Sequence, residues 1–339
     1  MHRRRRWGAI ALIVAAGLLA WPATVGAEAN PMFDPQSGRA RAVVDLTWVV
    51  LFFVALVFII AEGLLIFALV RYRHRGEAGE PRQTFGNRRL EITWTAIPIV
   101  ILIFVFILTV RAMRVIAAPP AGGDALNVTL IGHQWWWEYR YPDLGIVTAN
   151  ELHIPAGKTV HLQLESADVI HDFWVPQLGR KMDVVPGKIN SIYVQSDNPG
   201  VFDGACAEYC GTQHAWMRIK VIADSPADFD QWVQAQKATG AQPASPDALA
   251  GRGIFLSSAG NCASCHTING TANLANVGPD LTHVGSRTTI GAGVLTNTSD
   301  NMARWLTNPQ QVKPGNLMPD LRLTPDEVRA LTAYLESLK

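Results

Sequence analysis

Residues 206–217 read CAEYCGTQHAWM, and this short stretch brings several soft metal ligands together. They are Cys206, Cys210, His214 and Met217. Thiolate, imidazole and weak thioether ligands are typical of copper in electron transfer, whereas structural zinc sites seldom use methionine. One ligand of each kind would hold a single copper ion. The second thiolate allows two sulfurs to bridge a pair of copper ions, each of which would then need a histidine.

The second histidine must come from another part of the fold. His171 lies in the β-type run 168–175, which ends just before Pro176. We expect this position to direct the His171 side chain towards residues 206–217. A lone histidine on a strand is more often structural than metal-binding. We assign that structural role to His133, His153 and His161.

Short β-type runs surround these residues between positions 124 and 222. Gly, Pro and Asp turns separate the runs, which is typical of a small β-sandwich or barrel. The runs are residues 127–131, 158–165, 168–175, 189–196 and 217–222. We therefore predict a β domain over residues 116–224. Residues 225–246 then predict a short helix, capped by Ser225, and a linker.

Two apolar runs precede the β domain, and we predict membrane-spanning helices over residues 46–70 and 91–115. The loop 71–90 between them is rich in arginine, so the positive-inside rule places it in the cytoplasm. Residues 28–45 and everything from residue 116 onward are then extracytoplasmic. Glu62 lies within the first span, which favours packing against a larger partner in the membrane.

The first residues have the features of a secretory signal. Four arginines precede an apolar run, and Val25-Gly26-Ala27 offers a small-residue cleavage site. We predict a signal peptide over residues 1–27; the alternative is a third membrane helix. A net charge of +1 gives no sign of nucleic-acid binding.

Residues 247–339 change to a helical pattern, with helices expected at 247–257, 300–307 and 325–338. Thr324 and Glu327 predict a capping box for the last helix. Cys262, Cys265 and His266 form C-x-x-C-H, in which two thiols attach a haem covalently and the histidine binds its iron. Two disulfides are the usual expectation for four exported cysteines, but each pair here lies beside a histidine.

Iron in an electron carrier needs a sixth ligand. Met318 lies in the proline-flanked loop KPGNLMP, residues 313–319, and we predict that its thioether binds the iron. The alternative for any single methionine is core packing, which we expect for Met302 on a helix.

The C-terminal segment resembles class I cytochrome c through C-x-x-C-H, the Gly278-Pro279-x-Leu281 turn and the loop that ends at Pro319. The resemblance implies an all-α domain with Pro279 against the proximal side of the haem. Arg287 would reach a haem propionate, or else lie in a solvated loop.

The pattern of His171 followed by residues 206–217 is similar to the binuclear CuA centre of cytochrome c oxidase subunit II, which has a cupredoxin-like fold. GHQWWW (residues 132–137), VPQLG (175–179) and the two-helix hairpin also resemble that family, over about residues 40–235. The resemblance implies that Cys206 and Cys210 bridge two copper ions. His171 and His214 would bind one copper each, and Met217 would be a weak ligand.

Three further roles follow from the same resemblance. Glu208 would offer its backbone carbonyl to copper, and its carboxylate to a magnesium ion shared with the catalytic subunit. Trp135 matches the tryptophan through which electrons enter, although strand alternation would bury Trp135 and expose Trp136. Glu91 matches an acid at the mouth of a proton-uptake path, but a helix N-terminus favours any carboxylate.

The whole chain resembles the bacterial variant of subunit II that carries a fused cytochrome c. The resemblance implies a two-pass protein of the inner membrane that receives electrons from a cytochrome c or an upstream cytochrome bc complex. It would pass them through haem c and CuA to subunit I, alongside subunit III, and no oxygen-reducing site lies in this chain. The alternatives are a free-standing electron carrier for another reductase and a copper-storage module.

Overall fold

The structure is a computed structural model that describes residues 31–73, 83, 85–120, 123–240, 243–257, 260–271 and 277–339. Residues 1–34 form one unit, in which the described part contains a short 3-10 helix, η1 (Pro31–Phe33). Residues 35–339 form the second unit. The predicted signal peptide lies outside the described residues, as does half of the predicted cytoplasmic loop.

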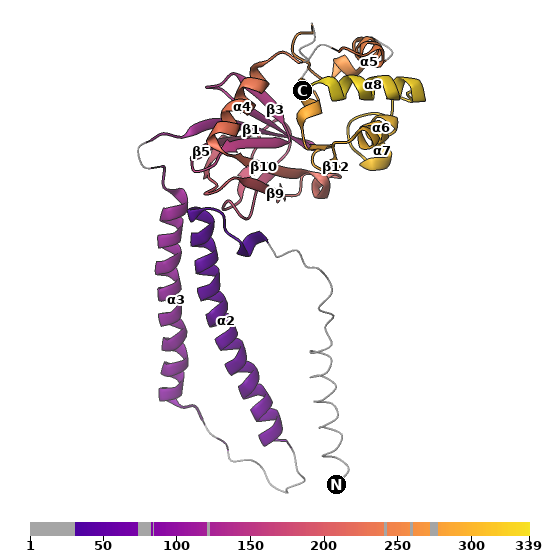
Figure 1. The fold of residues 1–339 in the computed structure, drawn as a ribbon. Coiled ribbons are helices and arrows are strands. Elements are labelled where there is room, and N and C mark those ends of the chain that lie inside the picture. Colours follow the sequence, from indigo (N-terminus) through magenta and orange to yellow (C-terminus); the bar gives the residue numbers. More distant parts are fainter. Residues whose placement is uncertain are drawn as a thin grey trace. The chain divides into compact units, whose positions relative to one another are not determined.

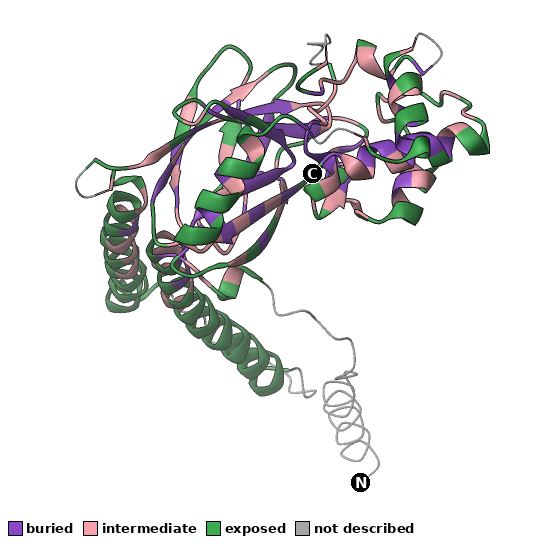
Figure 2. Ribbon diagram, turned by 45° about the horizontal axis from the view of Figure 1, so that its top comes forward, coloured by how far each residue is buried: buried purple, intermediate pink, exposed green. Residues whose placement is uncertain are grey.

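Two long helices open the second unit, α2 (Gly38–Arg71) and α3 (Arg88–Ala117). They run side by side (Figure 1) and meet at Phe53 and Phe104, whose ring centroids are 6.1 Å apart. Their most apolar windows have mean hydropathies of 3.0 and 2.6, enough by length and composition to cross a membrane. Figure 2 colours most of their length as exposed, which leaves an apolar surface for lipid or a partner.

The start of α2 is fastened to the β domain. Ser37 caps the helix by accepting a hydrogen bond from the Ala40 amide (3.0 Å), and its hydroxyl donates to the Leu178 carbonyl (2.9 Å). Arg41 pairs with Asp197. These contacts hold the helical hairpin and the sandwich in one unit.

Ten strands form two five-stranded sheets in a β-sandwich. One sheet has the order β3-β2-β1-β5-β8 and the other β4-β10-β9-β6-β7. The strands are β1 (Leu126–His133), β2 (Trp136–Tyr141), β3 (Ile146–Ala149), β4 (Glu151–Pro155), β5 (Val160–Ser166), β6 (His171–Trp174), β7 (Met182–Val184), β8 (Asn190–Val194), β9 (Gly200–Cys206) and β10 (Arg218–Asp224). Parallel pairs join β1 to β5 and β4 to β10, and the other pairs are antiparallel.

Alternating apolar residues explain why the sheets stack. In β5, Val160, Leu162 and Leu164 face the core and are fully buried, while the intervening residues are more exposed. The opposite sheet contributes Ile219 and Val221 from β10 to the same core cluster. Burial of such side chains is the main favourable term in folding, so it also sets the strand register.

The register decides where the predicted metal ligands lie. Strand β6 pairs with β9 so that Phe173 is opposite Cys206. His171 begins β6, and Cys206 ends β9. The chain then makes a loop, forms the 3-10 helix η2 (His214–Trp216), and enters β10 just after Met217.

The helix α4 (Pro226–Lys237) closes one side of the sandwich. As predicted, Ser225 is its N-cap and accepts a hydrogen bond from the Asp228 amide at 3.2 Å. Trp232 stacks on His153 with 4.5 Å between ring centroids, and the His153 ring also bonds to Asp224 at 2.8 Å. His153 therefore has the structural role expected from the sequence.

The C-terminal domain is built around the helices α5 (Pro246–Leu256) and α8 (Pro325–Ser337). They approach so closely at Gly251 that a Cβ there would lie 2.0 Å from the Ala330 carbonyl oxygen. The predicted capping box of α8 is present. The smaller elements are η3 (Cys262–Ser264), η4 (Val284–Ser286), β11 (Thr289–Ile290), β12 (Leu295–Thr296), α6 (Ser299–Thr307) and α7 (Pro309–Val312). The predicted hairpin, β-sandwich and helical C-terminal domain are thus all found.

Candidate copper and haem sites

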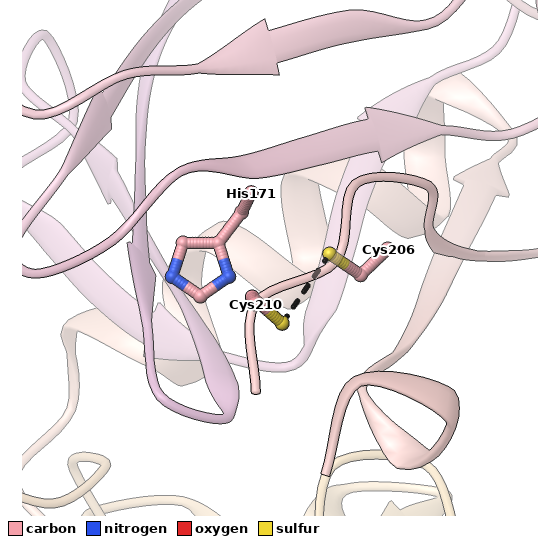
Figure 3. A group of neighbouring side chains, drawn as sticks. All are labelled: His171, Cys206 and Cys210. Carbon is pink, nitrogen blue, oxygen red and sulfur yellow. Dashed lines mark hydrogen bonds between the residues drawn. The ribbon is translucent and has the colours of Figure 1, made fainter. Parts of the chain in front are cut away.

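His171, Cys206 and Cys210 meet at one end of the sandwich, and all three are buried (Figure 3). Their ligand atoms lie within 4.8 Å of one another. The two sulfurs are 3.8 Å apart, far longer than the ~2.05 Å of a disulfide bond. The separation is short enough for both sulfurs to bind one metal ion at the ~2.3 Å typical of metal–thiolate bonds.

The ring of His171 is held in one orientation. Its Nε2 bonds to Oδ1 of Asp168 at 2.8 Å, while its buried Nδ1 has no hydrogen-bond partner among the described residues. A carboxylate on one ring nitrogen leaves the other free as a metal ligand. Gly132 gives the ring its space, because a Cβ there would lie 2.8 Å from the imidazole.

The two thiols share their protons unequally. A hydrogen bond from Cys210 and the nearby imidazole of His171 lower the pKa of Cys206 to about 3. The hydrogen bond to Cys206 and burial raise the pKa of Cys210 well above its usual range, and the charge of the Cys206 thiolate adds to this effect. Burial alone would lower the pKa of His171, but its bond to Asp168 and the nearby charge of Cys206 raise it. A metal that binds both sulfurs must therefore displace a proton from Cys210.

The other predicted copper ligands surround the sulfur pair. His214 Nδ1 and the Met217 sulfur are 3.7 and 3.9 Å from the Cys210 sulfur, and Met217 is fully buried. The backbone carbonyl oxygen of Glu208 lies 3.2 Å from the Cys206 sulfur, while the Glu208 side chain is exposed. All the residues that the sequence placed at the site are therefore near the two sulfurs.

Trp135 touches the same loop. It lies in the turn between β1 and β2, half-buried, and its indole N–H donates to the Cys210 carbonyl at 2.9 Å. Gln134 donates to the same oxygen at 2.8 Å. Trp136 begins β2, is buried, and stacks on His133 with ring centroids 4.1 Å apart. The alternation argument, which buried Trp135 and exposed Trp136, was wrong because Trp135 is outside the strand.

The C-terminal domain contains a cavity of about 230 Å³ lined by the residues predicted to bind haem. Those residues are Cys262, Cys265, His266 and Met318. The Nδ1 of His266 donates to the Pro279 carbonyl at 2.8 Å, and burial lowers the pKa of the imidazole. A neutral ring oriented in this way is suited to bind iron through Nε2. A Cβ at Gly278 would lie 2.6 Å from this ring.

Arg287 also lines the cavity, as it would if it reached a haem propionate, and does not lie in a solvated loop. One of its terminal nitrogens donates to the Asp280 carbonyl, and its buried Nε has no partner among the described residues. An unpaired guanidinium N–H fits a negatively charged group on the molecule that fills the cavity. Met302 is buried in the core of the domain, as expected.

Two features of this region were not found from the sequence. Asp168, which orients His171, lies only three residues before it, but the spacing alone does not reveal the contact. The cavity is also lined by Trp135, Trp136 and Asn150 of the sandwich. This cavity and the loop that contains Cys210 are therefore on either side of Trp135.

Glu91 lies in the first turn of α3. Its carboxylate accepts a hydrogen bond from the Asn87 amide at 3.1 Å, while the Asn87 side chain caps the helix through the Leu90 amide at 3.2 Å. This contact is the helix-terminal stabilisation that the sequence offered as an alternative to a proton path. Glu62 is exposed on α2, as a residue that faces a partner would be.

Comparisons with known proteins match all three parts of the chain. Residues 26–111 match the family described as cytochrome c oxidase subunit II, transmembrane domain, and residues 145–224 match its periplasmic domain. Residues 248–339 match cytochrome c. The cytochrome c oxidase subunit 2 of Alkalihalophilus pseudofirmus is 37% identical over 93% of this chain and 92% of its own.

Two further relatives cover smaller parts. The subunit 2 of Bacillus subtilis is 35% identical over 81% of this chain and 82% of its own. The crystal structure of the periplasmic domain of subunit II of cytochrome oxidase from Bradyrhizobium japonicum is 32% identical, covers 35% of this chain and 97% of that chain, and has a TM-score of 0.34. The C-terminal part of the chain is a cytochrome c domain, and the N-terminal hairpin makes the chain a two-pass membrane component of a haem–copper oxidase complex. The match to the Alkalihalophilus protein over nearly the full length places the chain in the cytochrome c oxidase subunit 2 family.

Proposed function

We propose that this chain carries electrons from a covalently bound haem c to a binuclear copper centre, and from there to the oxygen-reducing subunit I of the oxidase. The observation that carries the proposal is the buried pair of thiol sulfurs, 3.8 Å apart, beside the unpartnered Nδ1 of His171. The electron donor would be a cytochrome c or an upstream cytochrome bc complex, and subunit III would be a further partner.

The residues present fit copper. Cys206 and Cys210 would bridge two ions, His171 and His214 would bind one each, and Met217 would be a weak ligand. The backbone carbonyl of Glu208 would complete the set. When bound, copper supplies one-electron redox chemistry at this set of ligands. The buried sulfurs and the Asp168–His171 bond support a frame that changes little with redox state.

The residues of the C-terminal cavity fit a haem. Cys262 and Cys265 would attach it, and His266 and Met318 would bind its iron, which carries one electron when the haem is in place. Gly278 leaves space for the His266 ring, since a Cβ at this position would collide with it. Arg287 would neutralise a propionate with its unpaired Nε–H.

A short route connects the two sites. Trp135 lines the haem cavity, and its indole donates at 2.9 Å to the carbonyl of the proposed copper ligand Cys210. Only this hydrogen bond and the bonds within Cys210 lie between the tryptophan and the sulfur. We therefore assign to Trp135, rather than to Trp136, the role of the residue through which electrons enter the copper site.

The remaining roles concern the membrane and the catalytic subunit. The arginine-rich loop 71–90 would face the cytoplasm, which places the sandwich and the haem domain on the outer side of the inner membrane. The exposed carboxylate of Glu208 would bind magnesium shared with subunit I. Glu91 would lie at the mouth of a proton-uptake path in the complex.

Reciprocal cysteine variants test the proposal on the purified full chain. Cys206→Ser should abolish the near-infrared absorption of the copper centre and leave the c-type haem spectrum intact. Cys262→Ser should impair haem attachment and leave copper bound. Metal analysis and paramagnetic resonance of the wild type complete the test. A single copper ion in the wild type, or a delocalised copper pair that survives Cys206→Ser, would contradict the proposed ligand set.

A further inference from the structure

Glu151 is a buried carboxylate whose partners all come from the other domain. It begins β4 of the sandwich and is only 2% exposed. Thr288 donates to it through its amide (3.0 Å) and its hydroxyl (2.6 Å), and Thr289 does the same at 2.8 and 2.9 Å. Every hydrogen bond that the structure gives this carboxylate therefore crosses from the haem domain to the copper domain.

The two threonines begin a segment that lies against the sandwich. We call residues 288–293 the docking loop. The Ala292 carbonyl accepts from the Arg218 amide at 3.3 Å, and the Ala292 side chain forms a small buried cluster with Trp136 and Ala149. The docking loop thus makes polar contacts with Glu151 and Arg218, and apolar contacts with Trp136 and Ala149.

Glycine allows the loop to come close to the sandwich. Gly293 has φ of +81°, and a Cβ there would lie 2.7 Å from the Arg218 Cβ. A second close approach is at Gly315, where a Cβ would lie 2.8 Å from the Thr212 side chain. Side chains at these positions would force the domains apart, so the surfaces are complementary in shape as well as in hydrogen bonding.

We infer that Glu151 is a positioning residue that anchors the haem domain on the copper domain in one orientation. The carboxylate can satisfy its hydrogen bonds within the protein only when Thr288 and Thr289 are docked on it. Bonds to an ionised acceptor are stronger and more demanding in geometry than neutral ones. The orientation that results is the one in which Trp135 lines the haem cavity.

The anchor gives the fused domain more than a covalent tether. A flexible linker raises the local concentration of a module but leaves its orientation free. The anchor at Glu151 fixes the orientation of the haem domain, so the haem faces Trp135 whenever the domain is docked. Its importance for electron transfer rests on the proposed function, whereas its importance for docking does not.

A cleavable chain tests the inference. A protease site is placed between Gly240 and Pro243 of the full chain, and the binding of the cleaved haem domain to the membrane-anchored part is measured in detergent. Glu151→Gln should weaken this binding about tenfold or more. The variant removes the negative charge, and it replaces one accepting oxygen by an NH2 group, which cannot accept a hydrogen bond from the threonines. It should slow electron transfer from haem to copper without changing either absorption spectrum.

Two further variants separate docking from folding. Thr288→Val with Thr289→Val should have the same effect from the other domain, and combining it with Glu151→Gln should add little, because both remove one interaction. Asp143→Asn, which neutralises an exposed carboxylate of the same sandwich, should have no effect.

The outcomes distinguish the two proposals. Unchanged binding of the cleaved domain in both Glu151→Gln and the threonine pair, with both spectra intact, would overturn the anchor. A fully additive triple variant would also overturn it. A wild-type chain without the copper spectrum would instead contradict the proposed function, and the binding measurement would still decide the question of the anchor.

Discussion

At the scale of single residues, Asp168 decides which nitrogen of His171 faces the two thiols. Its Oδ1 bonds to Nε2 of the ring, and its Oδ2 accepts the Gln134 amide at 2.6 Å. Burial alone would raise the pKa of Asp168, but these bonds hold it below its usual value. The carboxylate therefore stays ionised and fixes the ring with Nδ1 towards the sulfurs.

This arrangement predicts the effect of Asp168→Asn. The variant removes the negative charge and allows the His171 ring to turn, so copper affinity should fall by about 10–100-fold. Competition with a copper chelator, followed by the copper absorption, measures the change. Asp143→Asn serves as the matched control and should retain full affinity. Equal affinities in wild type, control and Asp168→Asn would show that the aspartate does not orient the ligand.

The sequence was sufficient for some residues of the site and not for others. The types and spacing of Cys206, Cys210, His214 and Met217 pointed to copper because each is a ligand by its own chemistry. Asp168 was not identified, because a carboxylate near a histidine acquires its role only through a contact made by folding. His171 was chosen among the histidines from its place in the run before Pro176, and the resemblance to a known family then supported this choice.

At the scale of elements, segments with a strong local signal were predicted best. Helices α4 and α8 begin at the caps expected from Ser225 and Thr324. Strands β1, β5, β6, β8 and β10 overlap the expected runs. Strand β2 was expected from the alternation that includes Trp135 and Trp136, but five of its six residues are buried, so exposure does not alternate along it. The alternation also misjudged the burial of Trp135, because this residue lies in the turn before β2 and outside the strand.

The segment around Gly278 gives a prediction at this scale. It passes so close to His266 that a Cβ would lie 2.6 Å from the imidazole ring. Gly278→Ala should push the ring from its place, which would reduce haem incorporation and shift the haem potential. Redox potentiometry and haem content per chain measure both effects. Gly253→Ala in α5 is the control, since its Cβ meets nothing within 4 Å and alanine favours a helix. A normal haem content and potential in Gly278→Ala would contradict the expected displacement.

At the scale of the whole molecule, the contact between the β-sandwich and the C-terminal domain was beyond sequence reasoning. Glu151 and Thr288 are 137 residues apart, and neither has a motif that announces its partner. Lys313 also makes a contact between the domains that no sequence motif announces. Its buried ammonium group donates to Gly291 of its own domain at 3.0 Å and to the Trp216 carbonyl of the copper domain at 3.3 Å. Such contacts depend on two surfaces that exist only after each domain has folded.

Lys313 makes the docking of the two domains depend on pH. Burial lowers its pKa from the usual 10.5 to about 8. The undocked domain, with Lys313 in water, therefore binds more protons than the docked one between these two values. Docking should be weakest below about pH 8 and strengthen as the pH rises through this window, by at most about tenfold per pH unit.

The cleaved full chain measures this dependence directly. Binding of the haem domain should tighten by roughly tenfold between about pH 7.5 and about pH 9.5, while the haem spectrum reports that the domain remains folded. Lys313→Met keeps an unbranched side chain without a titrating group, so its binding should lose most of the pH dependence. Lys188→Met, at an exposed position, should behave as the wild type does. The same slope in Lys313→Met and wild type would show that a group other than Lys313 connects proton release to docking in this window.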